Sequence, residues 1–246
     1  MLGSHNERPD GISVALERSA ILAQTRESLE PWGDVLDNRR SLRAWIVAAS
    51  ATLWLAAIGV GFGMLWKYQN SSGAAGVQPS QWPADSRVET AAGRATLVMA
   101  AHPHCPCTRA SIGELALLMA RCQGRVSAYV LFLKPPGFAE GWEETDLWES
   151  AARIPGVTAL VDEGGVEAGR FNAATSGATM LYGLDGRLLF CGGITSSRGH
   201  SGDNDGRSAI IALVNGDGAA PSGAPVFGCP LIDEAAACEV ERPCSK

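Results

Sequence analysis

Two cysteines one residue apart, Cys105 and Cys107, are the residues of this chain with the most evident chemistry. They follow an apolar, strand-like run at 95–101 and precede apolar residues at helical spacing. At the start of a helix, unpaired backbone N–H groups and the positive end of the helix dipole stabilise a thiolate. A protonated His102 or His104 beside the pair would add to this effect. We therefore predict a redox site with a lowered thiol pKa.

A disulfide between Cys105 and Cys107 requires a tight bend at Pro106, because extended residues two apart lie near the limit of the Cα separation that a disulfide allows. So small a ring is expected to be strained, and strained disulfides are the easily reduced ones used for exchange. We expect Cys105 to attack a partner's disulfide through a mixed disulfide and Cys107 to resolve it.

The elements around this pair alternate between strands and helices. Beyond the strand at 95–101 and the helix that starts at 108, the patterns predict strands at 125–133, 157–161, 177–182 and 187–191 and helices at 145–153, 166–171 and 207–214. A turn at 184–186 joins the last two strands into a hairpin. This order predicts an α/β fold, a central mixed sheet flanked by helices.

The segment 104–115 (HCPCTRASIGEL) resembles the active-site segment of membrane-tethered thioredoxin-like proteins of the TlpA and ResA kind. The resemblance covers about 95–214, including 161–171 and 179–190. A narrower likeness, through 196–204 (SSRGHSGDN) and 226–231 (VFGCPL), is to bacterial thioredoxin-like proteins labelled RedB. The resemblance implies a thioredoxin-like fold and an exported thiol–disulfide oxidoreductase.

In this alignment Cys105 falls on the family's attacking cysteine. The sequence departs from the family's pattern at two other positions. Cys107 lies one place early, so that Thr108 occupies the family's resolving position. Gly177 falls on the family's cis-proline, which faces the active-site sulfur. The usual backbone shape for substrate pairing is therefore not expected at Gly177.

The loop 195–205 is expected to border the same site. If Gly177 lies opposite the cysteines, the antiparallel strand that follows returns the chain to that edge of the sheet. Arg198 and His200 in this loop are then candidates for steering a thiolate or a partner. The alternative is a solvated glycine-rich loop without chemistry.

Seven cysteines suit an exported chain better than a cytosolic one, and their odd number leaves at least one thiol free or paired between molecules. Cys122 and Cys191 lie in apolar surroundings and are predicted to be small core residues. A disulfide between Cys238 and Cys244 is one pairing of the remaining three cysteines, with Cys229 the third.

An uncharged apolar run of about 23 residues, 44–66, is long enough to cross a hydrocarbon core of roughly 30 Å as a helix. The apolar run is too long for the hydrophobic region of a cleaved signal peptide, and the polar segment before it is too long for the charged region that begins one. Trp45, Trp66 and Tyr68 suit the interfacial belts. Three arginines precede the run and one lysine closely follows it: Arg39, Arg40, Arg43 and Lys67. The positive-inside rule therefore predicts a cytoplasmic N-terminus, with everything after Tyr68 on the outer side of the bacterial inner membrane.

The predicted organisation has five parts. They are a cytoplasmic tail (1–43), a transmembrane helix (44–68), a flexible linker rich in Ser, Gly, Pro and Ala (69–94), a thioredoxin-like domain (95–216) and a cysteine-containing tail (217–246). The net charge of −6 and pI near 5.3, with no basic cluster, argue against nucleic-acid binding. With 46% apolar residues, the chain can bury a substantial core.

Three functions remain open. The first is thiol–disulfide exchange with protein thiols or disulfides, without a bound cofactor. If the protein reduces disulfides, a membrane electron donor must supply its electrons. The second is copper(I) handling, or zinc handling, by the soft and imidazole ligands His102, His104, Cys105 and Cys107. The third is a non-catalytic tethered binding domain with a structural Cys-Pro-Cys staple. The small ring favours an oxidant or isomerase, whereas the family resemblance favours a reductant, which we prefer.

Overall fold

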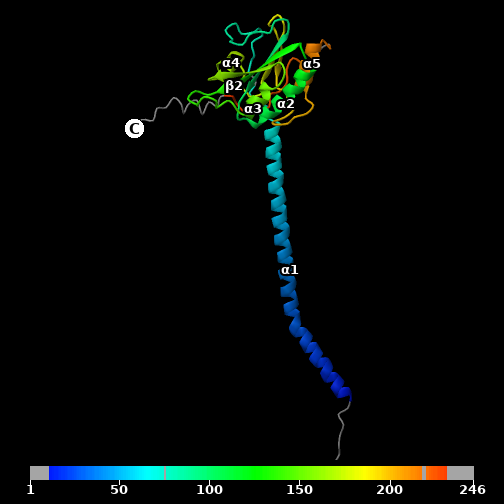
Figure 1. Cartoon of the computed structure of the whole chain (residues 1–246). Helices are drawn as coiled ribbons and strands as arrows, with labels where there is room; N and C mark the ends of the chain where they lie inside the picture. The colour runs from blue at the N-terminus through cyan, green and yellow to red at the C-terminus, as the bar shows by residue number, and fades with distance from the viewer. Residues whose placement is uncertain (1–10, 75, 218–219, 232–246) are drawn as a thin grey trace, which may run out of the picture. The chain divides into compact units, whose positions relative to one another are not determined.

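The computed structural model describes the backbone of residues 11–74, 76–217 and 220–231, and the side chains of all of these except 11–37. The elements, in chain order, are α1 (Gly11–Gln69), β1 (Ala95–Ala101), α2 (Pro106–Arg121), β2 (Val126–Lys134), α3 (Asp146–Ala152), β3 (Val157–Glu163), α4 (Val166–Arg170), β4 (Thr179–Tyr182), β5 (Leu188–Gly192) and α5 (Asp205–Asn215) (Figure 1). The chain divides into two compact units, Met1–Met64 and Leu65–Lys246.

The second unit is built on one five-stranded mixed sheet with the order β3-β2-β1-β4-β5. The strand β1 pairs in parallel with β2, which pairs in parallel with β3. The other neighbour of β1 is the antiparallel strand β4, and β4 and β5 form the predicted antiparallel hairpin. Parallel β-α-β units followed by a hairpin and a closing helix are the thioredoxin-like arrangement, as the sequence predicts.

The two faces of the sheet are covered by different elements because side chains alternate along a strand. Leu97 and Met99 of β1 point into a core cluster with residues of α2, α3 and α5. Val98 and Ala100 point to the opposite face, into a second cluster with residues of α4 and the segments 82–88 and 226–231. Because β1 is the central strand of the sheet, all of its residues beyond the first are buried.

Local sequence signals explain where α2, α3 and α5 begin. Pro106 begins α2, where its missing N–H costs no helical hydrogen bond. Thr145 caps α3 by accepting from the N–H of Leu147 at 3.3 Å, and Asn204 caps α5 by accepting from the N–H of Arg207 at 2.8 Å. The predicted strands and helices of this unit are present, with bounds that differ by a few residues at most.

The segment before β1 is the main difference between the predicted and the observed organisation. We predicted residues 69–94 as a flexible linker, but the described part of this segment packs on the domain. The Trp82 ring lies edge-on against Phe171 and Tyr182, with both centroid distances 5.1 Å, and Val88 is buried. The Tyr182 hydroxyl donates to the Pro79 carbonyl at 3.1 Å. The apolar side chains within this glycine- and proline-rich segment therefore attach it to the α4 face.

The segment after α5 also folds against the domain. Gly223 forms a parallel bridge with Cys191 of the edge strand β5, and Pro230 forms an antiparallel bridge with Thr175. Leu231 is buried in the second core cluster. The predicted pairing of Cys238 with Cys244 lies outside the described residues.

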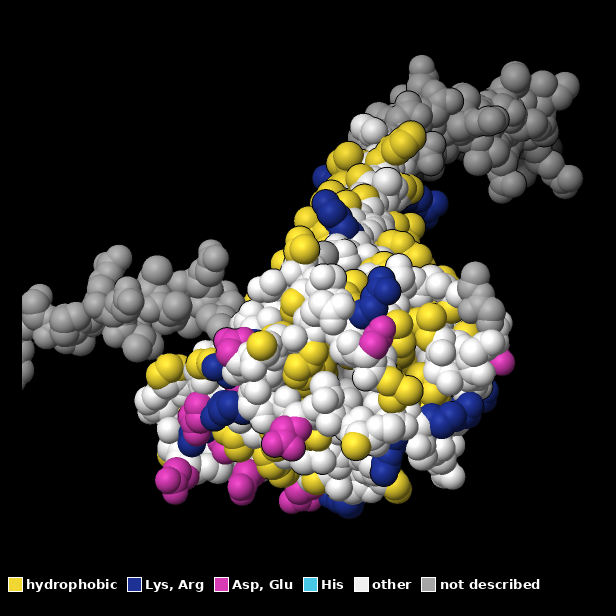
Figure 2. All heavy atoms as spheres, turned by 90° about the horizontal axis from the view of Figure 1, so that it is seen from above, with side chains coloured by type: hydrophobic (Ala, Val, Ile, Leu, Met, Phe, Trp, Pro, Cys, Tyr) yellow, Lys and Arg dark blue, Asp and Glu magenta, His cyan; other side chains and the backbone are white. Residues whose placement is uncertain are grey.

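Charges of both signs are distributed over the surface of the domain. On the face shown in Figure 2, Lys and Arg side chains lie beside Asp and Glu side chains. Exposed ion pairs include Arg109 with Asp146 at 2.6 Å and Arg153 with Glu149 at 2.7 Å. Exposed pairs of this kind contribute about 0–1 kcal/mol each, so the fold depends mainly on its two apolar clusters.

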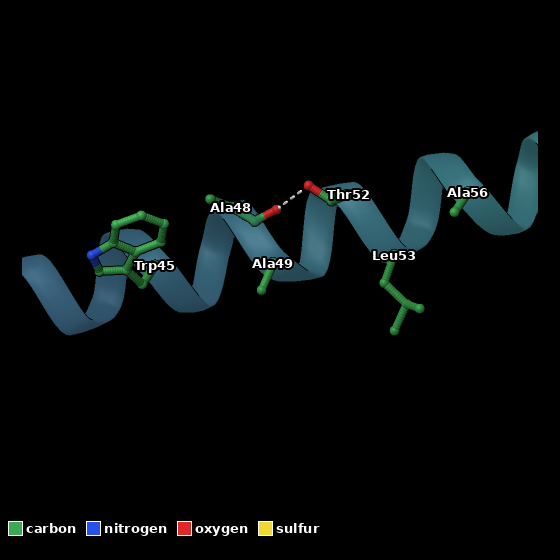
Figure 3. Close-up of a pocket in the computed structure, with 6 residues that line it drawn as sticks. All are labelled: Trp45, Ala48, Ala49, Thr52, Leu53 and Ala56. Carbon is green, nitrogen blue, oxygen red and sulfur yellow. Dashed lines mark hydrogen bonds between the residues drawn. The ribbon is translucent and has the colours of Figure 1, made fainter.

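The described residues of the first unit, 11–64, all belong to α1. This helix continues through Pro31 and Gly33, residue types that commonly end or kink a helix. Its stretch Asn38–Gln69 is the one helix, within the described part of the chain, long and apolar enough to cross a membrane. Large apolar side chains such as Trp45, Leu53 and Phe62 are exposed along it. Figure 3 shows a shallow apolar face of this stretch, where the Thr52 hydroxyl donates to the Ala48 carbonyl at 2.9 Å.

Candidate redox site

Cys105 is the N-cap residue of α2, and Cys107 lies in the first turn of that helix. The backbone of Cys105 is extended, with φ −87° and ψ 121°, and its carbonyl accepts from the N–H of Thr108 at 3.0 Å. Both cysteines are buried, with 3% and 7% of their surfaces exposed. The sequence therefore predicts the placement of the pair at a helix N-terminus, and Pro106 fixes where that helix begins.

A third cysteine, Cys229, completes the site. Its Sγ lies 3.0 Å from the Sγ of Cys105, although the two residues are 124 positions apart. The sulfur atoms of Cys105, Cys107 and Cys229 all lie within 4.8 Å of one another. The sequence does not predict this position for Cys229, because neither the VFGCPL likeness nor the count of cysteines assigns it a partner.

Backbone pairing places Cys229 in the site. The Ser176 N–H donates to the Cys229 carbonyl at 2.9 Å, and the Leu231 N–H donates to the Ala174 carbonyl at 3.0 Å. A Cβ at Gly228 would overlap the carbonyl oxygen of Ser176, so only glycine fits this close approach. The residues on both sides of Cys229 thus lie antiparallel to the loop that precedes β4.

That loop is tied to the cysteine motif by hydroxyl groups. The Ser176 hydroxyl accepts from the N–H of His102 at 2.9 Å and lies 2.8 Å from the hydroxyl of Thr108, which is itself buried. Gly177 follows, with φ at +90°, and its N–H donates to the Ala100 carbonyl at 2.7 Å. A Cβ at Gly177 would lie 2.9 Å from the Ser111 hydroxyl of α2, so a side chain at this position would require that hydroxyl to move.

The two histidines of the motif face Trp142 in the loop before α3. The ring centroids of His102 and His104 lie 5.8 and 4.5 Å from that of Trp142, and His104 Nε2 lies 3.2 Å from the Trp142 carbonyl oxygen. The Nδ1 of His102 accepts from the N–H of His104 at 3.2 Å. Burial, and then the neighbouring His104, lowers the pKa of His102, which favours the neutral ring. The predicted help from a protonated His102 is therefore reduced.

The predicted four-ligand cluster of His102, His104, Cys105 and Cys107 is not what the structure brings together. Within the described residues, the group whose donor atoms lie within 4.8 Å of one another is the three cysteines, and neither histidine belongs to it. The reason is geometric, because the imidazoles pack on Trp142 while Cys229 approaches from the other end of the chain.

The three thiols are electrostatically different. Burial raises the pKa of Cys105, but hydrogen bonds from the Cys229 thiol and from the N–H groups of Cys229, Thr108 and Cys107 outweigh it, so the pKa is lowered. Burial and the charge on Cys105 raise the pKa of Cys107. Burial and the hydrogen bond to Cys105 raise the pKa of Cys229 to about 12. Cys105 is therefore the thiol that ionises first, with Cys229 donating to it.

The loop 195–205 borders the site through its backbone and Arg198. The Arg198 guanidinium donates to the carbonyl oxygens of Gly228 and of Ser71, the latter at 3.2 Å, and lies 4.9 Å from the centre of the Tyr68 ring. Its charge lowers the pKa of Cys107 and of Cys229, against the larger effect of burial. Arg198 thus holds the residue next to Cys229. His200 is exposed, and its described hydrogen bond is from its N–H to the Ser197 carbonyl.

A buried ion pair fixes this loop to α2. Glu114 is 1% exposed and accepts from the guanidinium of Arg207, from the N–H of Gly202 at 2.8 Å and from the side-chain amide of Asn204 at 3.2 Å. The buried Glu114 carboxylate of α2 faces α5 and the loop rather than solvent.

The remaining described cysteines lie outside the site. Cys122 is buried at the end of α2 in the first core cluster, as predicted. Cys191 is half-buried in β5 and packs against the second cluster. Burial raises the pKa of both thiols, which makes them poor nucleophiles.

Comparisons with known proteins give likenesses of structure only. No protein-family model and no curated protein matches the chain. Similar solved structures include a hypothetical protein from Sinorhizobium meliloti 1021, with 20% identity, a TM-score of 0.47 and coverage of 66% of this chain and 96% of that one. An uncharacterized conserved protein from Geobacillus kaustophilus has 21% identity, a TM-score of 0.45 and coverage of 66% and 92%.

A third similar structure is a secreted disulfide oxidoreductase of Mycobacterium tuberculosis, described as homologous to Escherichia coli DsbE. It has 19% identity and a TM-score of 0.38, with coverage of 50% of this chain and 83% of that one. The assignment of this chain to the thioredoxin-like class rests on its own strand order and directions, and on the helices that cover each face of its sheet.

Proposed function

We propose that this chain is a membrane-tethered thiol–disulfide oxidoreductase in which Cys105 is the attacking cysteine. The observation that carries the proposal is the environment of Cys105, a buried helix N-cap thiol whose pKa is lowered by hydrogen bonds from a neighbouring thiol and three backbone N–H groups. A thiolate, rather than a thiol, attacks a disulfide. The sequence pairs Cys105 with Cys107 as a Cys-Pro-Cys redox couple, and the resolution step needs a second thiol within reach.

The exchange takes place in two steps. The Cys105 thiolate bonds to one sulfur of a partner disulfide, and the other sulfur of that disulfide leaves as a thiolate. A second thiol of this chain then bonds to Cys105 Sγ, releases the first partner sulfur and gives up its proton. The partner gains two electrons and this chain loses two, so an external dithiol must reduce the chain again.

Direction and location extend this proposal. The apolar stretch of α1 supports a single transmembrane helix, and Arg39, Arg40 and Arg43 before it support a cytoplasmic N-terminus. The domain then lies outside the bacterial inner membrane, where protein disulfides form. We propose a reductant of protein disulfides that receives electrons from a membrane carrier.

The test is the pH dependence of Cys105 alkylation by iodoacetamide, read by mass spectrometry on the reduced full-length protein in detergent. Because its pKa is lowered, Cys105 should be alkylated at pH values where an ordinary thiol, with a pKa of about 8.5, is mostly protonated. Reduction of a model protein disulfide should be lost in Cys105→Ser and kept in Cys122→Ala, whose thiol is buried away from the site. Alkylation only at alkaline pH, with full activity in Cys105→Ser, would refute the proposal.

Copper(I) binding is a second candidate function, favoured by the three sulfur atoms within 4.8 Å of one another. Three thiolates match the soft ligands that Cu(I) prefers. The raised pKa values of Cys107 and Cys229 mean that binding would release protons, so affinity should rise with pH. Titration with Cu(I) against a competing chelator tests this, and an unchanged affinity in Cys229→Ser would exclude the three-sulfur site.

A further inference from the structure

Cys105 has two neighbouring thiols, and they are not equivalent as partners for a disulfide. Cys107 lies in the first turn of α2, directly after the extended N-cap residue Cys105, and its Sγ is within 4.8 Å of the Cys105 Sγ, whereas the Sγ of Cys229 is 3.0 Å away. A bond between Cys105 and Cys107 would require the first turn of α2 to open, including the 3.0 Å hydrogen bond from the Thr108 N–H to the Cys105 carbonyl. Cys229 approaches instead from outside the helix.

The Sγ atoms of Cys105 and Cys229 are 3.0 Å apart, whereas a disulfide bond is about 2.05 Å long. An approach of about 1 Å therefore suffices, and α2 keeps its first turn. We infer that Cys229, and not Cys107, is the resolving cysteine for mixed disulfides on Cys105. This inference rests on the proposed function, since it assigns one step of that exchange.

The position of Cys229 is set by its own backbone. Its carbonyl accepts from the Ser176 N–H, and Arg198 donates to the carbonyl of the preceding residue, Gly228. Further back, the Gly73 N–H donates to the Val226 carbonyl at 2.8 Å, and Leu231 is buried on the other side. These contacts on both sides of Cys229 fix its backbone, so that its side chain points toward Cys105.

The same segment covers the attacking sulfur. With Cys229 in place, Cys105 is only 3% exposed, so a protein disulfide reaches it only after residues 228–230 move aside. The partner's cysteine then occupies the place that Cys229 leaves. When the segment returns, the Cys229 sulfur bonds to Cys105 Sγ, the partner's sulfur leaves with the proton of Cys229, and a Cys105–Cys229 disulfide remains.

The experiment traps the mixed disulfide on the full-length protein in detergent, reduced beforehand and kept in a metal chelator. Oxidised glutathione is added as the probe disulfide, the reaction is quenched with acid, and intact masses are recorded over time. In Cys229→Ser the glutathione adduct on Cys105 should persist at least tenfold longer than in the wild type. In the matched variant Cys107→Ser the adduct should clear and leave a disulfide between Cys105 and Cys229.

A second measurement needs no variant. The oxidised wild type is digested under non-reducing conditions with trypsin and with a protease that cleaves at Asp233 and Glu234, because these bonds separate Cys229 from Cys238 and Cys244. Cys105 and Cys107 lie on one tryptic peptide, 95–109, so the linked peptides are fragmented, and we expect the bond from Cys229 to be assigned to Cys105 and not to Cys107. Persistence of the adduct in Cys107→Ser but not in Cys229→Ser, or a bond from Cys105 to Cys107, Cys238 or Cys244, would overturn the inference.

These outcomes are distinct from failure of the proposed function. If Cys105 forms neither a glutathione adduct nor a disulfide in the wild type or in either variant, the exchange activity itself is refuted. If an adduct forms on Cys105 and is resolved by another thiol, the exchange activity stands and only the role of Cys229 is lost.

Discussion

Removing the charge of Glu114 should destabilise the domain far more than removing an exposed carboxylate. In Glu114→Gln the amide oxygen still accepts from the Gly202 N–H, but Arg207 loses its buried partner. The Arg207 side chain is 10% exposed, and its remaining ion pair is with the fully exposed Asp203 at 2.9 Å. Breaking a buried ion pair by removing one partner costs about 3–5 kcal/mol, because an uncompensated charge stays buried.

This free energy converts into a change of melting temperature that is easily measured. For a unit of the size of Leu65–Lys246, 1 kcal/mol corresponds to about 2–4 °C, so we expect a fall of about 6–20 °C. The assay is thermal unfolding of the full-length protein in detergent, followed by near-ultraviolet circular dichroism. The matched control is Glu149→Gln, which breaks the exposed pair with Arg153 and should lower the melting temperature by about 2–4 °C at most.

A double variant separates the lost charge pair from lost packing. In Glu114→Gln with Arg207→Met no buried charge remains, so at least half of the lost stability should return. The loop 195–205 should also be released in the single variant, and with it the contact of Arg198 with Gly228, so Cys229 should be alkylated faster. A melting temperature within about 2 °C of the wild type in Glu114→Gln, or a double variant less stable than the single one, would refute this reasoning.

Two further predictions concern backbone conformation and pH. Gly177→Ala should lower the melting temperature by about 2–8 °C, because a side chain at φ +90° carries about 1–2 kcal/mol of strain and its Cβ would lie 2.9 Å from the Ser111 hydroxyl. The control is Gly169→Ala, which has open space around the new Cβ and should not lower the melting temperature. Equal effects of the two substitutions would contradict this prediction. Burial raises the pKa of Glu167, but hydrogen bonds from Ser86 and Arg87 lower it more, so the pKa in the folded state is lowered. The contribution of Glu167 to stability is therefore present above the unfolded-state pKa of about 4.3 and is lost as the pH falls through the lower folded-state pKa. The difference in melting temperature between the wild type and Glu167→Gln should therefore shrink from pH 7 to pH 3, and a constant difference would show that the carboxylate is not the cause.

The parts of the fold that follow local rules could be predicted from the sequence. The apolar run 95–101 became the buried strand β1, and Pro106, Thr145 and Asn204 mark helix starts by chemistry that acts within a few residues. The hairpin of β4 and β5 follows from its turn residues in the same way. Periodicity and capping are local signals, so they identify the elements and their order.

The contacts between distant residues could not be predicted in this way. Composition suggested a flexible linker at 69–94, although Trp82 and Val88 gave a signal that part of it would be buried. Glu114 is a charged residue whose partner, Arg207, is 93 positions away. Cys229 reaches Cys105 through pairing of irregular segments, for which neither periodicity nor spacing gives a signal. The sequence therefore predicts that Cys105 and Cys107 lie together at the start of a helix, but it does not predict that Cys229 lies beside them.

The bridge between Gly223 and Cys191 has a consequence for solubility. Strand β5 is an edge of the sheet, and an uncovered edge offers backbone groups that pair with the edge of another copy. Here the Cys191 N–H donates to the Ser222 carbonyl at 3.0 Å, and the Cys191 carbonyl accepts from the Ala224 N–H at 3.3 Å. A chain cut after α5 would lose this cover together with Cys229, so it would tend to associate edge to edge as well as lose a thiol.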